Sequence, residues 1–143
     1  LPVDTLLAVA EEARHLHGVT EVMAVLDARM SEVYHAGYRW ADDQWHATQE
    51  LGLCAPEALS VPAHTSVVGN AQAAYPDRLA PASQHLPALP TATALLRLAP
   101  KLMADGQLVD ASYALPLYIR DKVAKTTAER EAEQRLASAT PQA

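Results

Sequence analysis

The hydrophobic pattern of the chain is strongest between residues 22 and 40. Val22–Leu26 is a continuous apolar run, which is typical of a strand buried on both faces of a sheet. Asp27–Ser31 interrupts this run, and β-branched and aromatic residues resume from Val33 to Trp40. The pattern predicts two strands joined by a tight polar turn. A hairpin of this kind is not stable alone, so further strands or a helix must pack around it.

Two longer segments show the periodicity of amphipathic helices. The first spans Leu1–Gly18, where Asp4 can cap the first turn and Gly18 can end the helix. The second spans Thr91–Asp105. The apolar stripes predict that the buried faces consist of Leu6, Leu7, Ala10, Ala13 and Leu16 in the first helix and of Leu95, Leu96, Leu98, Leu102 and Met103 in the second.

Shorter elements are predicted between and after these helices. Trp45–Leu51 is expected to add a third strand to an antiparallel meander, and Thr65–Val68 a fourth strand that ends at Gly69. The prolines between residues 77 and 90 favour a loop, with a short strand around Leu79. Leu115–Ile119 is predicted to be a short extended segment. The order of elements by itself indicates a mixed α and β domain.

Composition narrows the class of protein. The chain has 143 residues, of which half are apolar, as expected of one globular domain. A net charge of −6 gives no electrostatic footprint for direct RNA binding. The single cysteine, Cys54, excludes an internal disulfide and a cysteine-based zinc site. With no apolar run near the twenty or so residues of a membrane span and no signal-peptide pattern, we expect a cytoplasmic protein without membrane contact.

Three motifs in the chain point to one family. Residues 26–38 read LDARMSEVYHAGY, residues 116–124 read PLYIRDKVA, and Val68–Ala71 runs on to Tyr75–Pro76. In this order and at about this spacing, they resemble the D-A-R-M-G-E-V-Y segment, the P-x-Y-L-R-x-x-V-A segment and a third, shorter segment of the TsaB (YeaZ) family. That family consists of accessory proteins of bacterial tRNA threonylcarbamoyladenosine synthesis. The resemblance implies the ribonuclease H-like half of an actin-like ATPase fold, an α/β unit with a mixed sheet of about five strands flanked by helices.

The resemblance also implies a domain organisation. Residues 1–125 would form a ribonuclease H-like C-terminal domain, and residues 126–143 a C-terminal helix and tail. The family's N-terminal domain would then be absent from this chain; a first residue of leucine is consistent with a fragment, and equally with a processed or partly disordered chain. One face of this domain packs on that N-terminal half in the family, so we expect exposed apolar residues here.

The residues show no recognisable catalytic set. In actin-like ATPases the first hairpin binds phosphate through glycines, because a phosphate must reach backbone N–H groups without obstruction. This chain keeps Asp27 but has no glycine between Ala28 and Met30. It has no nucleophile elbow, metal-ligand spacing or cysteine–histidine pair. We therefore expect no cofactor and no metal.

The residues that form a structural or partner motif are Asp27, Arg29, Glu32, Tyr34, Gly69, Tyr118 and Arg120. We expect Arg29 to brace the turn through hydrogen bonds to Asp27 or Glu32, with contact to a partner as the alternative. Tyr118 and Arg120 would share one face of a strand, for packing or as an anchor for a partner. Gly69 is expected to end a strand, with nucleotide contact as the alternative.

The resemblance implies a non-catalytic scaffold and dimerisation subunit of the threonylcarbamoyladenosine modification complex. Its partners would be a TsaD-like catalytic subunit and a TsaE-like ATPase, with homodimerisation as an additional option. It would meet tRNA only through the complex. The alternative is an enzyme, either a glycoprotease-like hydrolase or an ATPase of the same fold.

Overall fold

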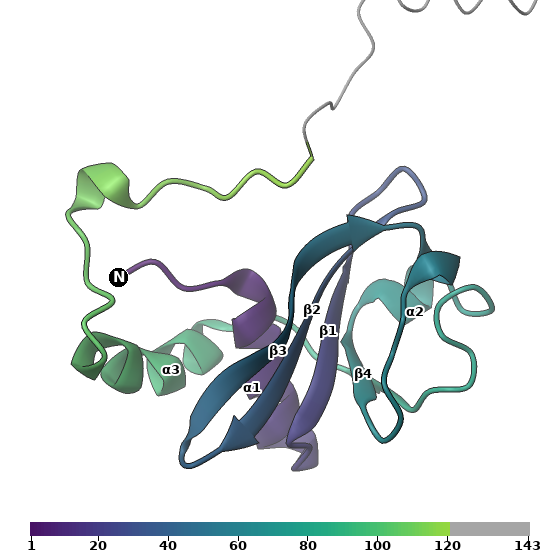
Figure 1. The fold of residues 1–143 in the computed structure, drawn as a ribbon, viewed down its shortest axis with the longest axis horizontal. Coiled ribbons are helices and arrows are strands. Elements are labelled where there is room, and N and C mark those ends of the chain that lie inside the picture. Colours follow the sequence, from purple (N-terminus) through teal and green to yellow (C-terminus); the bar gives the residue numbers. More distant parts are fainter. Residues whose placement is uncertain (121–143) are drawn as a thin grey trace, which may run out of the picture.

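A five-stranded sheet forms the centre of the computed structural model, which describes residues 1–120 (Figure 1). The strand order is β3-β2-β1-β4-β5. The strands are β1 (Glu21–Asp27), β2 (Val33–Ala41), β3 (Gln44–Cys54), β4 (Ser66–Gly69) and β5 (His85–Pro87). The first three are antiparallel, and β4 and β5 continue the sheet parallel to β1. The predicted meander and the mixed sheet of about five strands are confirmed.

Three helices accompany the sheet within the described residues: α1 (Thr5–His17), α2 (Ala71–Ala74) and α3 (Ala92–Ala104). Short 3-10 helices occur at Pro56–Ala58 and Ala111–Tyr113. The predicted caps of α1 are confirmed, because Asp4 accepts the backbone N–H of Leu6 at 2.9 Å and Gly18 adopts a left-handed φ of 71°. The helix predicted from residue 126 lies outside the described residues. No helix within residues 1–120 is long and apolar enough to cross a membrane.

Strand β1 is buried on both faces, which explains its uninterrupted apolar sequence. Val22 and Ala24 pack toward α1, whereas Met23 and Val25 pack toward the segment that follows β3. On that second face the buried side chains also include Val33, Leu59, Val67, Ala71 and Leu79. The sheet is therefore covered by a helix on one side and by the chain between β3 and β5 on the other.

The strand predicted around Leu79 is wrong in position. The Leu79 backbone N–H bonds to the Tyr75 carbonyl at 3.1 Å, which is a local turn, and the Leu79 side chain is fully buried. The strand instead forms at β5, where Val67 pairs with His85. A buried leucine in a turn and one in a strand share the same hydrophobic signal, so the sequence did not separate them.

The predicted extended segment at Leu115–Ile119 forms no strand. Its residues pair with no part of the sheet, and the side chains of Leu115 and Leu117 are exposed. After α3 the chain turns back and runs toward the turn between β1 and β2 (Figure 1).

Helix α3 packs on α1, with Trp45 of β3 beside the contact, and this arrangement corrects its predicted face. Ala94 and Leu98 are buried against Ala8 of α1. Leu95, Leu96 and Met103 were predicted to be buried but are exposed, as is Leu16 at the end of α1. A helix that lies against one neighbouring helix covers only a narrow stripe, whereas its sequence offers a wider apolar face.

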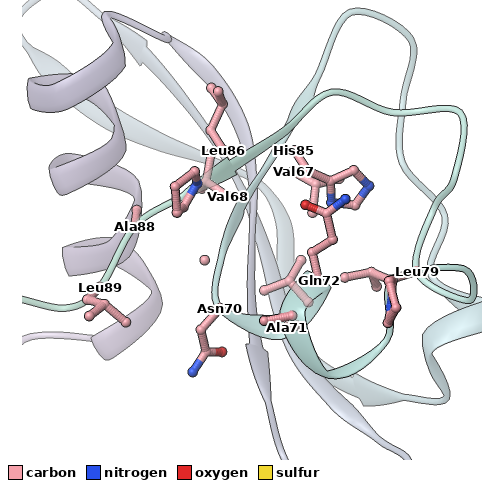
Figure 2. Close-up of a pocket in the computed structure, with 15 residues that line it drawn as sticks. Val67, Val68, Asn70, Ala71, Gln72, Leu79, His85, Leu86, Ala88 and Leu89 are labelled. Carbon is pink, nitrogen blue, oxygen red and sulfur yellow. The ribbon is translucent and has the colours of Figure 1, made fainter.

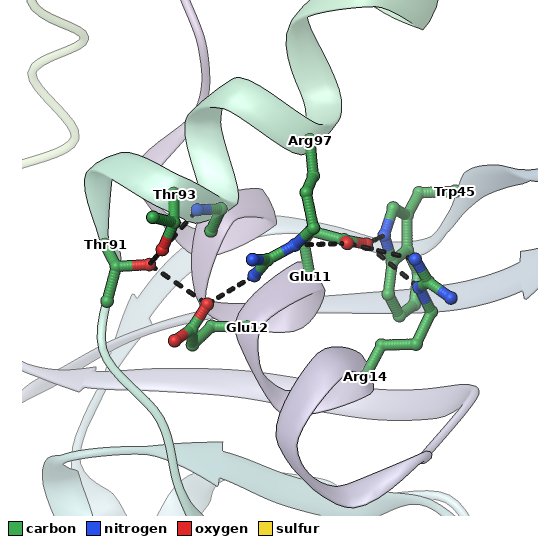
Figure 3. Close-up of polar contacts among 8 residues, drawn as sticks. Glu11, Glu12, Arg14, Trp45, Thr91, Thr93 and Arg97 are labelled. Carbon is green, nitrogen blue, oxygen red and sulfur yellow. Dashed lines mark hydrogen bonds and ion pairs between the residues drawn. The ribbon is translucent and has the colours of Figure 1, made fainter.

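A network of charged side chains joins α1, α3 and β3 (Figure 3). Glu11 is 1% exposed, and its carboxylate accepts hydrogen bonds at 3.0 Å from Arg14, from the Trp45 ring N–H and from Arg97. Burial raises the pKa of Glu11, but the hydrogen bonds from Arg14, Trp45 and Arg97 outweigh it and hold the pKa below its ordinary value. The buried carboxylate is therefore ionised and fully paired.

Glu12 extends this network to the start of α3. Its carboxylate accepts the Thr91 hydroxyl at 3.0 Å and pairs with Arg97. Thr91 also caps α3, because its hydroxyl oxygen accepts the Ala94 backbone N–H at 3.1 Å. Arg97 thus connects both buried carboxylates of α1 to α3, and it is the central link between the two helices.

Removing Arg97 should therefore loosen α3. We expect Arg97→Ala to lower the free energy of unfolding by about 2–4 kcal/mol, somewhat less than for a fully buried pair because the Arg97 side chain is 27% exposed. Lys101→Ala on the same helix is the matched control, since Lys101 pairs with Asp105 at the surface and should cost less than about 1 kcal/mol. Urea denaturation measures both. Equal losses in the two variants would contradict the role of Arg97.

Candidate functional site

Three segments that are far apart in the sequence meet at one end of the sheet. They are the turn between β1 and β2, the region around α2, and the last described residues. Hydrogen bonds join Asp27 to Asn70 and to Tyr75, and Arg120 to Ala28. The three family-like motifs of the sequence are thus brought together in space, and we take this end of the sheet as the candidate site.

Asp27 is the centre of this arrangement. Its Oδ1 accepts the Arg29 backbone N–H and the Tyr75 hydroxyl, each at 2.9 Å. Its own backbone N–H donates to Oδ1 of Asn70 at 3.0 Å. Desolvation and the Asp27 carboxylate raise the pKa of the Tyr75 hydroxyl above its ordinary value. Asp27 therefore connects the end of β1 to both ends of α2. Asn70 and Tyr75 belong to the third family-like motif but were not among the predicted site residues.

The turn after Asp27 has an unusual backbone. Arg29, Met30 and Ser31 have φ values of 63°, 55° and 58°, a left-handed conformation that non-glycine residues seldom adopt in succession. Ala28 and Glu32 close the turn, because the Ala28 N–H bonds to the Glu32 carbonyl and the Glu32 N–H to the Arg29 carbonyl, both at 3.0 Å. Consecutive strained residues of this kind are characteristic of functional sites, where surrounding contacts hold them in place.

The prediction that hydrogen bonds hold Arg29 in the turn is confirmed for its backbone, because the Arg29 N–H donates to Oδ1 of Asp27, but the side chain is not held in the same way. The Arg29 side chain is 88% exposed, and its guanidinium lies 3.4 Å from Oδ2 of Asp27 in a surface ion pair. Oδ1 of Asp27 accepts the Arg29 backbone N–H and the Tyr75 hydroxyl, and the Glu32 carboxylate is bound by Arg120. Of the two predicted partners, Asp27 therefore binds Arg29, whereas Glu32 is engaged by Arg120.

Arg120 also braces the turn, through its side chain. Its Nη2 donates to the Ala28 carbonyl at 3.0 Å and to Oε2 of Glu32 at 2.5 Å, and its Nη1 lies 3.6 Å from Sδ of Met30. Tyr118 is 83% exposed and belongs to no strand. The prediction that Tyr118 and Arg120 share one face of a strand is therefore wrong, and only Arg120 reaches the turn.

Tyr34 and Gly69 are positioned by the sheet. Tyr34 is half-buried on β2 and packs against the core cluster beneath α1. Gly69 ends β4, as predicted, with a φ of 138°, and a Cβ at this position would lie 1.9 Å from the Val25 carbonyl oxygen. Only glycine allows β4 and β1 to approach so closely.

A cavity of about 480 Å³ lies beside Gly69, between β4, α2 and β5 (Figure 2). Its wall is mostly apolar, with Val25, Val67, Ala71, Leu79, Leu86 and Ala88 among its lining residues. Asn70, Gln72 and His85 supply polar groups, but the Asn70 amide oxygen already accepts the Asp27 N–H, and His85 Nε2 lies 3.0 Å from the Ala80 carbonyl oxygen. The size suits a small ligand, whereas the lining offers no charged group for a phosphate.

Within residues 1–120, the remaining titratable side chains form no further recognisable site. No group of three histidine, cysteine, aspartate or glutamate side chains that could hold a metal occurs within residues 1–120. Burial raises the pKa of the Cys54 thiol, which reduces its reactivity. Burial also lowers the pKa of His35, which lies on β2 beside Gln49.

Comparison with known proteins shows what the chain is similar to. No protein-family model matches it. It is 32% identical over 132 residues to the tRNA threonylcarbamoyladenosine biosynthesis protein TsaB of Escherichia coli strain K12, and the match covers 85% of this chain and 57% of TsaB. The chain therefore spans little more than half the length of this curated relative.

Two solved structures from Pseudomonas aeruginosa share the fold. YeaZ has 32% sequence identity and a TM-score of 0.74, with 82% of this chain and 57% of YeaZ covered. An uncharacterised protein described as similar to the peptidase YeaZ has 31% identity and the same TM-score of 0.74, with coverages of 84% and 58%. The predicted α/β fold, the ribonuclease H-like half of an actin-like ATPase, is confirmed.

The close approach at Gly69 gives a direct test of the geometry at this site. We expect Gly69→Ala to destabilise the protein by about 3 kcal/mol or more, because the added Cβ would meet the Val25 carbonyl. Gly106→Ala is the matched control: Gly106 also has a left-handed φ, of 78°, but nothing lies within 4 Å of its added Cβ, so the cost should be about 1–2 kcal/mol. Thermal and urea unfolding compare the two. Similar losses would show that β4 does not pack so tightly on β1.

Proposed function

We propose, from the confirmed likeness of this chain to the TsaB/YeaZ family, that it acts in the cytoplasm in the biosynthesis of threonylcarbamoyladenosine in tRNA. The observation that carries this proposal is its 32% identity to TsaB across 85% of the chain. The convergence of all three family-like motifs on one site supports it, because unrelated chains of the same fold have no reason to preserve that combination of residues.

Within this pathway we assign the chain a non-catalytic, scaffolding role. The backbone N–H groups of Ala28, Arg29 and Glu32 are all used inside the turn, and the Asp27 N–H is used by Asn70. A phosphate-binding loop needs such groups free and pointing at the ligand. The Asp27 carboxylate is likewise occupied by Tyr75 and the Arg29 N–H, so it is not poised to hold a metal-bound nucleotide.

We further propose that the chain works by protein contacts. Its partners would be a TsaD-like catalytic subunit and a TsaE-like ATPase, with pairing of two copies as an additional option. Its net charge of −6 is unfavourable for direct binding of a polyanion, so tRNA would be met through the complex. The exposed arginine of the turn and the exposed apolar side chains of residues 113–118 support a role in protein association.

Size-exclusion chromatography tests the proposed partnership. The chain, mixed with the TsaD-like subunit of the same organism, should elute earlier than either protein alone, because the two form a complex. A mixture with serum albumin at the same concentration is the control for non-specific association. Separate elution at micromolar concentrations of both proteins would contradict the proposed role.

Titration with nucleotide distinguishes the scaffold from the ATPase alternative. Isothermal titration of magnesium ATP into the chain should give no binding heat at millimolar nucleotide, because the N–H groups of Asp27, Ala28, Arg29 and Glu32 are already bonded within the protein. Micromolar affinity that requires magnesium would instead identify the chain as a nucleotide-binding member of this fold.

A further inference from the structure

Met30 is an exposed residue whose sulfur lies beside a buried arginine. It is the second of the three left-handed residues of the turn, with a φ of 55°, and it is 68% exposed. Its sulfur lies 3.6 Å from Nη1 of Arg120, whose side chain is only 14% exposed. The thioether of Met30 is therefore open to solvent and, at the same time, in contact with a cation.

The Arg120 guanidinium has more hydrogen-bond donors than strong acceptors around it. A guanidinium carries five N–H groups. Nη2 donates to the Ala28 carbonyl and to the Glu32 carboxylate. Nη1 meets the sulfur of Met30, which is a weak acceptor, and Nε is buried and has no partner within residues 1–120. An oxygen placed on the Met30 sulfur would supply the strong acceptor that Nη1 lacks.

We propose that Met30 is a site of oxidation by peroxide, and that its sulfoxide fastens the turn to Arg120. A lone pair of the sulfur attacks one oxygen of hydrogen peroxide, so that an S–O bond forms as the O–O bond breaks. The other oxygen takes the proton of the transferred oxygen and leaves as water. Sulfur is oxidised by two electrons, and the peroxide is reduced by two. Methionine sulfoxide reductases reverse the change.

The sulfoxide should strengthen the contact with Arg120, because its oxygen carries a partial negative charge. A hydrogen bond from a guanidinium to such an oxygen is charge-assisted, and it is stronger than the bond to a thioether. The Met30 side chain is flexible and exposed, so the new oxygen can turn toward Nη1 without displacing packed atoms. The added polarity also costs little at an exposed position. The oxidised turn should therefore hold Arg120 more firmly than the reduced turn.

The other methionines of the chain provide internal comparisons, since the sequence has three in all. Met23 is 1% exposed in the core, where peroxide does not reach it. Met103 is 49% exposed on α3 and lies outside the turn. Met103 is thus expected to be oxidised as Met30 is, but without a gain in stability at the turn.

Oxidation of two matched variants tests the proposal. Met103→Leu leaves Met30 as the exposed methionine, and Met30→Leu leaves Met103. Each complete chain is treated with hydrogen peroxide until peptide mass mapping shows one added oxygen at the exposed methionine and none at Met23. Oxidation should raise the melting temperature of Met103→Leu by about 2 °C or more. It should not raise that of Met30→Leu, which also controls for oxidation of Cys54.

Three results of this comparison would overturn the proposal. The first is a Met30 that stays reduced under conditions that oxidise Met103. The second is an unchanged or lower melting temperature in the oxidised Met103→Leu chain. The third is an equal rise in both variants, because the gain would then not come from the turn.

A third variant assigns the gain to the guanidinium. Arg120→Leu, made in the Met103→Leu chain, removes all N–H donors of the side chain. Oxidised and reduced samples of this same protein are compared, so any stability lost through the substitution itself cancels. The rise in melting temperature on oxidation should disappear. A rise as large as that measured with Arg120 present would show that another contact receives the sulfoxide, and it would overturn the role of Arg120.

Amide hydrogen exchange gives a local measurement that needs no change at Arg120. In the Met103→Leu chain, oxidation of Met30 should slow exchange of the Ala28 and Glu32 N–H groups severalfold, because their hydrogen bonds close the turn. The amides of α1 are the control, and their exchange should be unchanged. Equal or faster exchange of the turn amides after oxidation would mean that the sulfoxide does not fasten the turn, and the proposal would fail.

Discussion

The burial of β1 on both faces is the constraint on which the rest of the structure depends. Val22 and Ala24 require α1 on one side, and Met23 and Val25 require the chain between β3 and β5 on the other. The first polar residue after this run, Asp27, therefore emerges at the edge of the core. The parallel neighbour β4 ends beside it, so that Asn70 and Tyr75 bond to Asp27. The position of the candidate site thus follows from the packing of one strand.

Helix α3 is attached to α1 more by charged side chains than by apolar packing. Its buried apolar contact with α1 is small, and the link is made by Arg97 between the two carboxylates of Glu11 and Glu12. A buried ion pair adds little net stability compared with apolar packing, but losing one partner is costly. The network therefore fixes where α3 lies, while Leu95 and Leu96 remain exposed. Exposed apolar side chains were expected of this chain, although these on α3 were predicted to be buried.

At the site, two arginines occupy different environments: the Arg120 side chain bonds to the turn, and the Arg29 side chain is exposed. The braced conformation of the turn depends on Arg120, which sequence analysis placed on a strand, and leaves Arg29 pointing into solvent. A left-handed turn without glycine is unfavourable for the free chain, so it persists only where several contacts agree on it. Asp27, Glu32 and Arg120 supply those contacts. Hydrogen bonds within the turn also use the backbone N–H groups of Ala28, Arg29 and Glu32.

The sequence by itself determined the local structure of this protein. The apolar run of β1, the caps of α1 at Asp4 and Gly18, and the end of β4 at Gly69 were all predictable, because each depends on neighbouring residues and their backbone preferences. The motifs also located the segments that form the site. Tertiary structure alone decided which side chains meet. Arg120 reaches Glu32 across 88 residues, and Leu79 is buried in a turn while β5 forms at His85–Pro87. Such contacts depend on the path of the folded chain, and hydrophobic periodicity carries no information about that path.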